Sequence, residues 1–169
     1  MTLPVPLDYP DFSGTNGFLP GVGYDSYAVY GLYWDPKGDL WLGTAGAGLF
    51  RYDGEKVVWI NEAEEKGVVR AILQDQQGKI WFGNNVEGIY QYEGETLTNY
   101  SSQNADKQAI PFGALCMVEG EDGVLWIGTF DEGLWKYHPS SDTWIQFSPK
   151  TGLDALYISS LFIETSGRI

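Results

Sequence analysis

Short apolar runs separated by tight-turn residues recur along most of the chain, and no segment shows a sustained helical period. In the clearest copy, an apolar run at 69–74 leads through a turn containing Asp and Gly into a second run at 80–83. Third and fourth runs follow at 88–92 and 97–100, separated by a Glu-Gly turn. Asp caps its own turn and Gly supplies a positive φ. The pattern therefore predicts four antiparallel strands, here named A to D, joined by tight turns.

A Trp recurs at the same place in strand B of each copy, as Trp41, Trp81 and Trp126. These positions are spaced at roughly 40 to 45 residues, which is the length of a four-stranded propeller blade. The sequence therefore predicts an all-β fold, a β-propeller of four-stranded antiparallel blades, three complete and a fourth partial. The expected parts are blade 1 at 26–67, blade 2 at 68–112, blade 3 at 113–156, a partial blade 4 at 157–169, and an N-terminal segment at 1–25.

The two ends of the chain depart from complete repeats. Residues 157–169 match strand A, expected at 158–164, and the start of strand B, and they stop just before the position of the Trp. Repeat arrays usually end in an atypical capping repeat, so this end favours a fragment, a truncated gene or an exchanged blade. The N-terminal segment 1–25 resembles a strand D with its connector, which an exchanged blade of another chain would use.

Each strand B Trp is followed two positions later by Gly, as in Trp81 and Gly83. Residues two apart in a strand face the same side of the sheet. We expect the indole to fill the space between neighbouring blades and the glycine to leave room for it. Because this spacing recurs in each copy, it predicts a structural role for these aromatic side chains rather than a ligand platform.

The repeat reads Gly-x-hydrophobic-Trp-hydrophobic-Gly-Thr, then Gly-Leu and an aromatic-basic-Tyr run, and it resembles the two-component regulator propeller repeat. The connector at 149–153 and the segment at 15–20 strengthen the resemblance, which covers roughly residues 13–169. Asn84 departs from it, because Thr stands there in the other copies. The resemblance implies a bacterial signalling module from the extracytoplasmic half of hybrid two-component sensors, often responding to glycans. It implies a periplasmic location if the chain is part of such a sensor, and otherwise a cytoplasmic one.

Composition narrows the choice of partners. The hydrophobic fraction of 43% and the aromatic fraction of 15% are enough for a packed core. The net charge of −13 repels phosphate groups, so we expect no nucleic-acid partner and no anionic membrane surface. No apolar run approaches the roughly 18 residues of a membrane span, so no membrane insertion is expected, and the first residues do not read as a signal peptide.

The residues that usually carry chemistry are sparse. His138 is the only histidine and lies in a C–D turn, so a multi-histidine metal site cannot form within one chain. Cys116 is the only cysteine, which excludes an intramolecular disulfide, and its apolar neighbours favour a small buried hydrophobe over a nucleophile. Glu62, Glu64 and Glu65 lack a calcium-loop pattern around them. We therefore predict no catalytic residue, no metal and no cofactor.

The B–C connections are the best candidates for ligand binding, because they open at the same end of the blades as the D–A connections. Asn, acidic and aromatic side chains together suit sugar hydroxyls and ring faces. The predicted ligand-binding residues, for a small molecule, a glycan or a protein, are Asn84, Asn85, Glu87, Phe130, Asp131 and Glu132.

Two alternatives to a non-enzymatic binding module remain open at this point. One is a fragment of a propeller lyase or hydrolase, with carboxylates paired across a channel as in glycosidases. Virginiamycin-lyase-like propellers use a histidine base and a metal, for which His138 is misplaced. The other is a purely structural half-propeller assembly unit. For the binding module itself we also expect a homodimer that completes a propeller, since an unfinished blade has an exposed edge and twofold symmetry suits an exchange.

Overall fold

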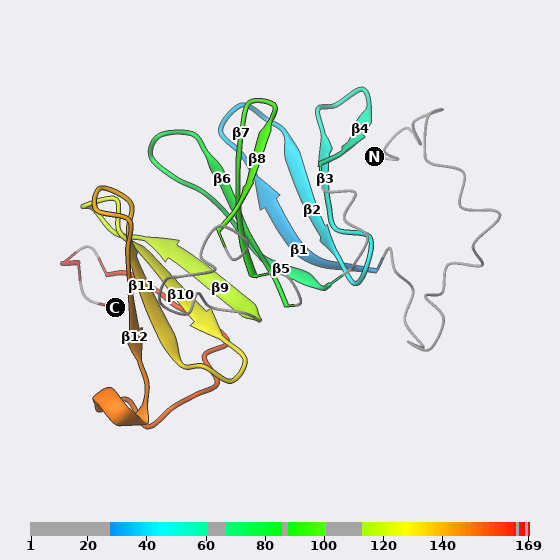
Figure 1. Cartoon of the computed structure of the whole chain (residues 1–169). Helices are drawn as coiled ribbons and strands as arrows, with labels where there is room; N and C mark the ends of the chain where they lie inside the picture. The colour runs from blue at the N-terminus through cyan, green and yellow to red at the C-terminus, as the bar shows by residue number, and fades with distance from the viewer. Residues whose placement is uncertain (1–27, 61–66, 86–87, 101–112, 165, 168) are drawn as a thin grey trace. The chain divides into compact units, whose positions relative to one another are not determined.

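The structure is a computed structural model, and it describes residues 28–60, 67–85, 88–100, 113–164, 166–167 and 169. The chain divides into two compact units, residues 1–69 and residues 70–169, which are described separately. The strands form three four-stranded antiparallel sheets, each built from strands consecutive in sequence (Figure 1). The predicted all-β fold of four-stranded antiparallel blades is confirmed.

Each blade runs through strands A to D in spatial order. Blade 1 consists of β1 (Val29–Trp34), β2 (Leu40–Thr44), β3 (Leu49–Tyr52) and β4 (Val57–Trp59). Blade 2 consists of β5 (Val69–Gln74), β6 (Ile80–Asn84), β7 (Gly88–Glu93) and β8 (Thr96–Asn99). Blade 3 consists of β9 (Ala114–Glu119), β10 (Leu125–Thr129), β11 (Leu134–His138) and β12 (Thr143–Phe147). Because the strands alternate in direction, the A–B and C–D turns of a blade share one end, and the B–C connection lies at the other.

The segment after β12 differs from the expectation. A short 3-10 helix, η2 (Pro149–Thr151), follows β12, and 158–164 is not a strand although strand A is predicted there. Ile158 N–H still donates to the Thr129 carbonyl oxygen at 2.9 Å, and Gly167 N–H donates to the Glu164 carbonyl oxygen at 2.8 Å. A β-strand requires at least one paired neighbouring strand, and the described part of the chain supplies no strand B for this segment.

The glycine that follows each strand B Trp makes room for a different partner from the one expected. A Cβ added to Gly83 would meet the side chains of Ala114 and Met117 on β9, and one added to Gly128 would lie 2.6 Å from the Ile158 side chain. Gly43 faces Val69 in the same way. The glycines therefore admit the strand A segment of the following repeat, and not the indole of their own strand.

The turn aspartates hold the strand B Trp in place in blades 1 and 2. Asp75 Oδ1 accepts backbone N–H groups of its own turn, as predicted, and Asp75 Oδ2 accepts from Trp81 Nε1 at 2.8 Å. Asp35 repeats this arrangement with Trp41 at 3.1 Å. Burial raises the pKa of Asp35, but the hydrogen bonds from Trp41 and from turn N–H groups outweigh it, and the net pKa is lowered. Each such Trp is therefore fixed by a hydrogen bond as well as by packing.

Blade 3 lacks this aspartate, because Gly120 stands in its place. Trp126 is only partly buried; it stacks on Phe147 with ring centroids 5.8 Å apart, and the Lys136 ammonium lies 4.9 Å from its ring. The Trp of blade 3 is therefore held by stacking and by a cation–π contact. The Trp at the same motif position thus has a different environment in blade 3.

The core of the unit 70–169 lies at the seam between blades 2 and 3. Ring contacts connect Trp81 to Tyr100 at 5.1 Å and to Tyr137 at 5.6 Å, and Tyr137 stacks on Trp144 at 4.2 Å. The buried core of this unit consists of Ala71, Trp81, Ile89, Ala114, Met117, Leu125, Ile127, Trp135, Tyr137 and Trp144. The expectation that these aromatics fill the space between blades is met here.

Candidate functional site

The B–C connection of blade 3 is shaped by a buried threonine. Thr129 Oγ1 donates to the Gly133 carbonyl oxygen at 2.8 Å and accepts from Glu132 N–H at 3.0 Å. Thr44 makes the equivalent bonds in blade 1, to Gly48 and from Ala47. A threonine at the end of strand B therefore closes the connection and presents the residues that follow it.

The predicted ligand-binding residues fall into different environments. Phe130 is 59% exposed, Asp131 is exposed, and Glu132 is half-buried. On blade 2, Asn85 is exposed, whereas Asn84 is only 1% exposed at the position that Thr44 and Thr129 occupy in the other blades. Glu87 lies outside the described residues. The structure thus brings Phe130, Asp131 and Glu132 together on one connection, and it places the Asn84 side chain inside the fold.

Tyr157 is a member of this surface that the sequence analysis did not single out. Its ring meets the ring of Phe130 edge to face, with centroids 5.5 Å apart, and it is 56% exposed. Phe130 N–H donates to the Gly113 carbonyl oxygen at 3.1 Å, which ties the B–C connection to the start of blade 3. Its position in the chain could have identified it, because Tyr157 stands on a D–A connection, and these connections open at the same end of the blades as the B–C connections.

Cys116 is the one cysteine of the chain, and its side chain is half-buried. Burial raises the pKa of the Cys116 thiol, and its Sγ lies 3.5 Å from the Ile158 carbonyl oxygen. A raised pKa keeps the thiol protonated at neutral pH, which is the opposite of what a nucleophile requires.

Among the described residues, no group of three or more His, Cys, Asp or Glu side chains is placed to hold a metal ion. The same part of the chain contains no helix long and apolar enough to cross a membrane.

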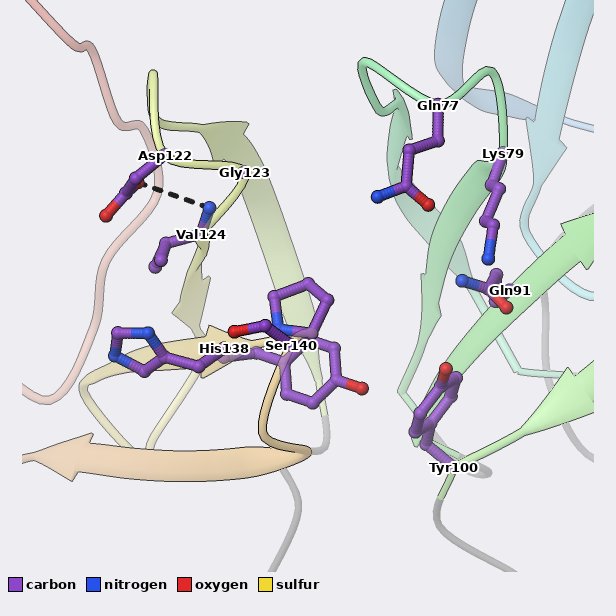
Figure 2. A pocket seen from close by; sticks show the side chains of 11 residues that line it. Gln77, Lys79, Gln91, Tyr100, Asp122, Gly123, Val124, His138 and Ser140 are labelled. Atoms are coloured by element: carbon purple, nitrogen blue, oxygen red, sulfur yellow. Dashed lines mark hydrogen bonds between the residues drawn. The ribbon is translucent and has the colours of Figure 1, made fainter.

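A cavity of about 440 Å³ opens at the seam between blades 2 and 3 (Figure 2). It is lined from the A–B turns of both blades, from β7 and Tyr100 after β8, and from β11 and the C–D turn of blade 3. Of the predicted ligand-binding residues that the structure describes, none lines it. His138 borders the cavity, and Figure 2 shows its imidazole turned away from Lys79, Gln91 and Tyr100.

The fold defines a class, proteins built of tandem four-stranded propeller blades. Within that class, the family model described as two component regulator propeller matches residues 23–46 and 65–86. These two segments thus match the two-component regulator propeller repeat, and the resemblance stated from the sequence is confirmed. No curated protein matches the chain in sequence.

Solved structures support the blade architecture. The extracellular domain of a protein described as a one component system from B. thetaiotaomicron superposes with a TM-score of 0.68 at 20% identity, over 86% of this chain and 19% of that one. Virginiamycin B lyase from Staphylococcus aureus superposes with a TM-score of 0.57 at 16% identity, over 72% of this chain and 41% of the lyase. The chain thus spans less than half the length of either protein, and at these identities the likeness shows the fold alone.

Proposed function

We propose that this chain is a non-enzymatic, ligand-binding part of an extracytoplasmic propeller sensor, and that Phe130, Tyr157 and Asp131 form its ligand surface. The single observation that carries the proposal is the exposed edge-to-face pair of Phe130 and Tyr157 beside a carboxylate. The two-component regulator propeller repeats support a sensor role, and the extracellular origin of the B. thetaiotaomicron domain supports a location outside the cytoplasm.

The chemistry of this surface suits an oligosaccharide. Exposed large aromatic rings that contact each other form an apolar patch, and such patches on soluble proteins tend to mark interaction sites. A pyranose presents C–H groups on its faces, which pack on aromatic rings, and hydroxyls around its edge, which hydrogen-bond to carboxylates. Asp131 is exposed next to Phe130 and could accept such a hydroxyl.

Phe130→Ala is expected to weaken oligosaccharide binding about two- to tenfold, because an aromatic stacking contact contributes about 0.5–1.5 kcal/mol. Titration calorimetry of the full chain with soluble oligosaccharides of glucose, galactose and xylose measures the effect. Ile145→Ala is the matched control, since Ile145 is an exposed apolar residue on β12 of the same blade. Unchanged affinity in Phe130→Ala, or an equal loss in Ile145→Ala, would contradict the proposal.

We also propose that two copies of the chain associate as a homodimer through the apolar face of strand A in blade 1. Val29 is 49% exposed, whereas the equivalent Val69 and Ala114 are 0% and 3% exposed, because glycines of strand B cover them. Leu32 on the same strand is also exposed. In the unit 70–169, Phe162 exposes a second apolar surface on the segment after β12. These two surfaces could meet in pairs about a twofold axis.

Leu32→Glu is expected to convert a particle with the mass of two chains into a single chain, because it places a charge in the apolar contact. Light scattering on a sizing column at several concentrations measures the mass. Val58→Glu, on the partly exposed outer strand β4, is the control and should leave the dimer intact. A single-chain mass for the unsubstituted protein at every concentration would overturn the association.

A further inference from the structure

The seam cavity lies at the end of the blades opposite to Phe130. Its rim includes Gln77 and Asp122 from the two A–B turns and Ser140 from the C–D turn of blade 3. Tyr100 lines it from within the seam. Its volume of about 440 Å³ falls within the roughly 300–1,000 Å³ typical of small-molecule sites.

The cavity coincides with a position where blade 2 departs from the other blades. In blade 1, Arg51 forms an ion pair with Asp39 at 2.6 Å, and its guanidinium lies 5.9 Å from the Trp41 ring. Register places Arg51 opposite Trp41, and it places Gln91 opposite Trp81 in blade 2. Blade 3 has a cation at this position, Lys136. Blade 2 alone has a neutral amide there.

The partner position in blade 2 has changed as well. Lys79 stands where blade 1 has Asp39, so it cannot form the equivalent ion pair with Gln91, and it pairs instead with Glu93 at 3.2 Å. Lys79 is more buried than Glu93, whose side chain is mostly exposed. The pair that covers the strand B Trp in blade 1 is therefore replaced in blade 2 by two polar side chains that line an open cavity. Figure 2 shows Lys79, Gln91 and Tyr100 along the blade 2 wall, with Ser140 on the facing wall.

The wall chemistry suits a ligand that both donates and accepts hydrogen bonds. The carboxamides of Gln77 and Gln91 and the hydroxyls of Tyr100 and Ser140 each have donor and acceptor atoms. The two charged groups, Lys79 and Asp122, have opposite sign and come from different blades, so neither sign of ligand gains a net attraction. An uncharged molecule with many hydroxyls matches this set best.

The walls are held in place before any ligand arrives. Gln76 N–H donates to Glu119 Oε2 at 2.8 Å, and Gln76 Nε2 donates to the Gly120 carbonyl oxygen at 3.0 Å, which ties the A–B turns of the two blades. Tyr137 Oη donates to Asp142 Oδ1 at 3.2 Å. Burial raises the pKa of Tyr137, with Tyr100 and Asp142 adding to the effect, so the phenol stays protonated. A preformed site loses little free energy to ordering on binding.

We propose that the seam cavity between blades 2 and 3 is a second binding site, which takes an uncharged, hydroxyl-rich small molecule such as a mono- or disaccharide. This site is independent of the surface at Phe130, because the two share no residue and lie at opposite ends of the blades. A chain with both sites binds two molecules.

The test introduces the ion pair of blade 1 at the equivalent positions of blade 2. The double variant Lys79→Asp with Gln91→Arg restores the Asp39 and Arg51 pair and should fill the cavity, so we expect binding to fall at least tenfold. Tyr100→Phe keeps the ring and removes one hydroxyl, so it should weaken binding by a few-fold. This variant tests the site even if the double variant does not fold. Ile145→Ala, at an exposed residue that does not line the cavity, is the control, and Phe130→Ala removes the other proposed surface without changing any residue of this one. The probes are glucose, maltose, lactose and glucuronate, titrated into the full chain and followed by ligand-observed NMR.

Binding of a neutral sugar that the double variant or Tyr100→Phe weakens, and that Phe130→Ala leaves unchanged, supports the seam site. A neutral sugar lost only in Phe130→Ala overturns the seam site and leaves the proposed function standing. Unchanged binding in the seam variants, preference for glucuronate over the neutral sugars, or no binding of any probe also overturns it. Loss in the seam variants alone would argue against the Phe130 surface for that sugar, so the two proposals fail separately.

Discussion

Replacing Trp81 with alanine is expected to lower the free energy of unfolding of the unit 70–169 by about 3–5 kcal/mol, as for other large buried aromatics. Trp81 is 1% exposed and contacts the rings of Tyr100 and Tyr137 in the seam. Its removal leaves a cavity in that seam and takes the indole donor away from Asp75. Urea denaturation followed by circular dichroism measures the loss.

Trp126→Ala is the matched control, because Trp126 occupies the same motif position in blade 3. It is partly exposed, and Gly120 offers it no carboxylate, so its loss should cost less than half as much as that of Trp81. Equal losses for the two variants would show that the motif position, and not the local environment, sets the contribution of this residue.

Gly83→Val is expected to destabilise the same unit by about 1–3 kcal/mol or more, the usual cost of overpacking a well-packed core. Even a Cβ at this position would meet the side chain of Ala114 and lie 3.1 Å from Met117 Cε. Valine adds two further methyl groups, so β9 must move away from β6. The change is read as a shift in the urea midpoint of the unit.

Gly94→Asn serves as the control for this substitution. Gly94 has φ 64° and a Cβ there would meet nothing within 4 Å, and asparagine tolerates this left-handed conformation better than most residues. Its denaturation midpoint should stay close to that of the unsubstituted chain. A Gly83→Val protein as stable as Gly94→Asn would mean that the seam between blades 2 and 3 is looser than the structure indicates.

Sequence reasoning predicted the blades well because their signals are local. The spacing of Trp41, Trp81 and Trp126, and the turn residues between strands, fix the strands within each repeat without reference to the rest of the molecule. The segment 158–164 was wrongly predicted as a strand, because strand formation depends on a partner and not on the segment's own composition. The role of Gly83 was misread for a related reason, since its neighbour on β9 belongs to another repeat.

The candidate sites show the same division. Phe130 and Asp131 were predicted from loop position and are exposed, whereas Asn84 fills the place of a loop-closing threonine, a signal that the alignment of the repeats already contained. The seam cavity was not predicted, because its walls come from two repeats and because the place of Gln91 opposite Trp81 is visible only in the strand register. A residue that departs from the repeat therefore has two possible meanings. Asn84 is a structural replacement for a buried threonine, whereas Gln91 lines a cavity.

The contact between each strand B glycine and the following repeat has a consequence for how such chains can grow. Gly43 faces Val69, Gly83 faces Ala114 and Gly128 faces Ile158, so each repeat carries one half of a joint that its successor completes. Duplication or loss of a whole repeat in a gene preserves every joint, because any repeat offers the same small or β-branched residue to the one before it. A recombination event that cuts between the glycine and its partner still restores the joint when it joins equivalent positions, so tandem copies can be gained and lost without redesign of the core.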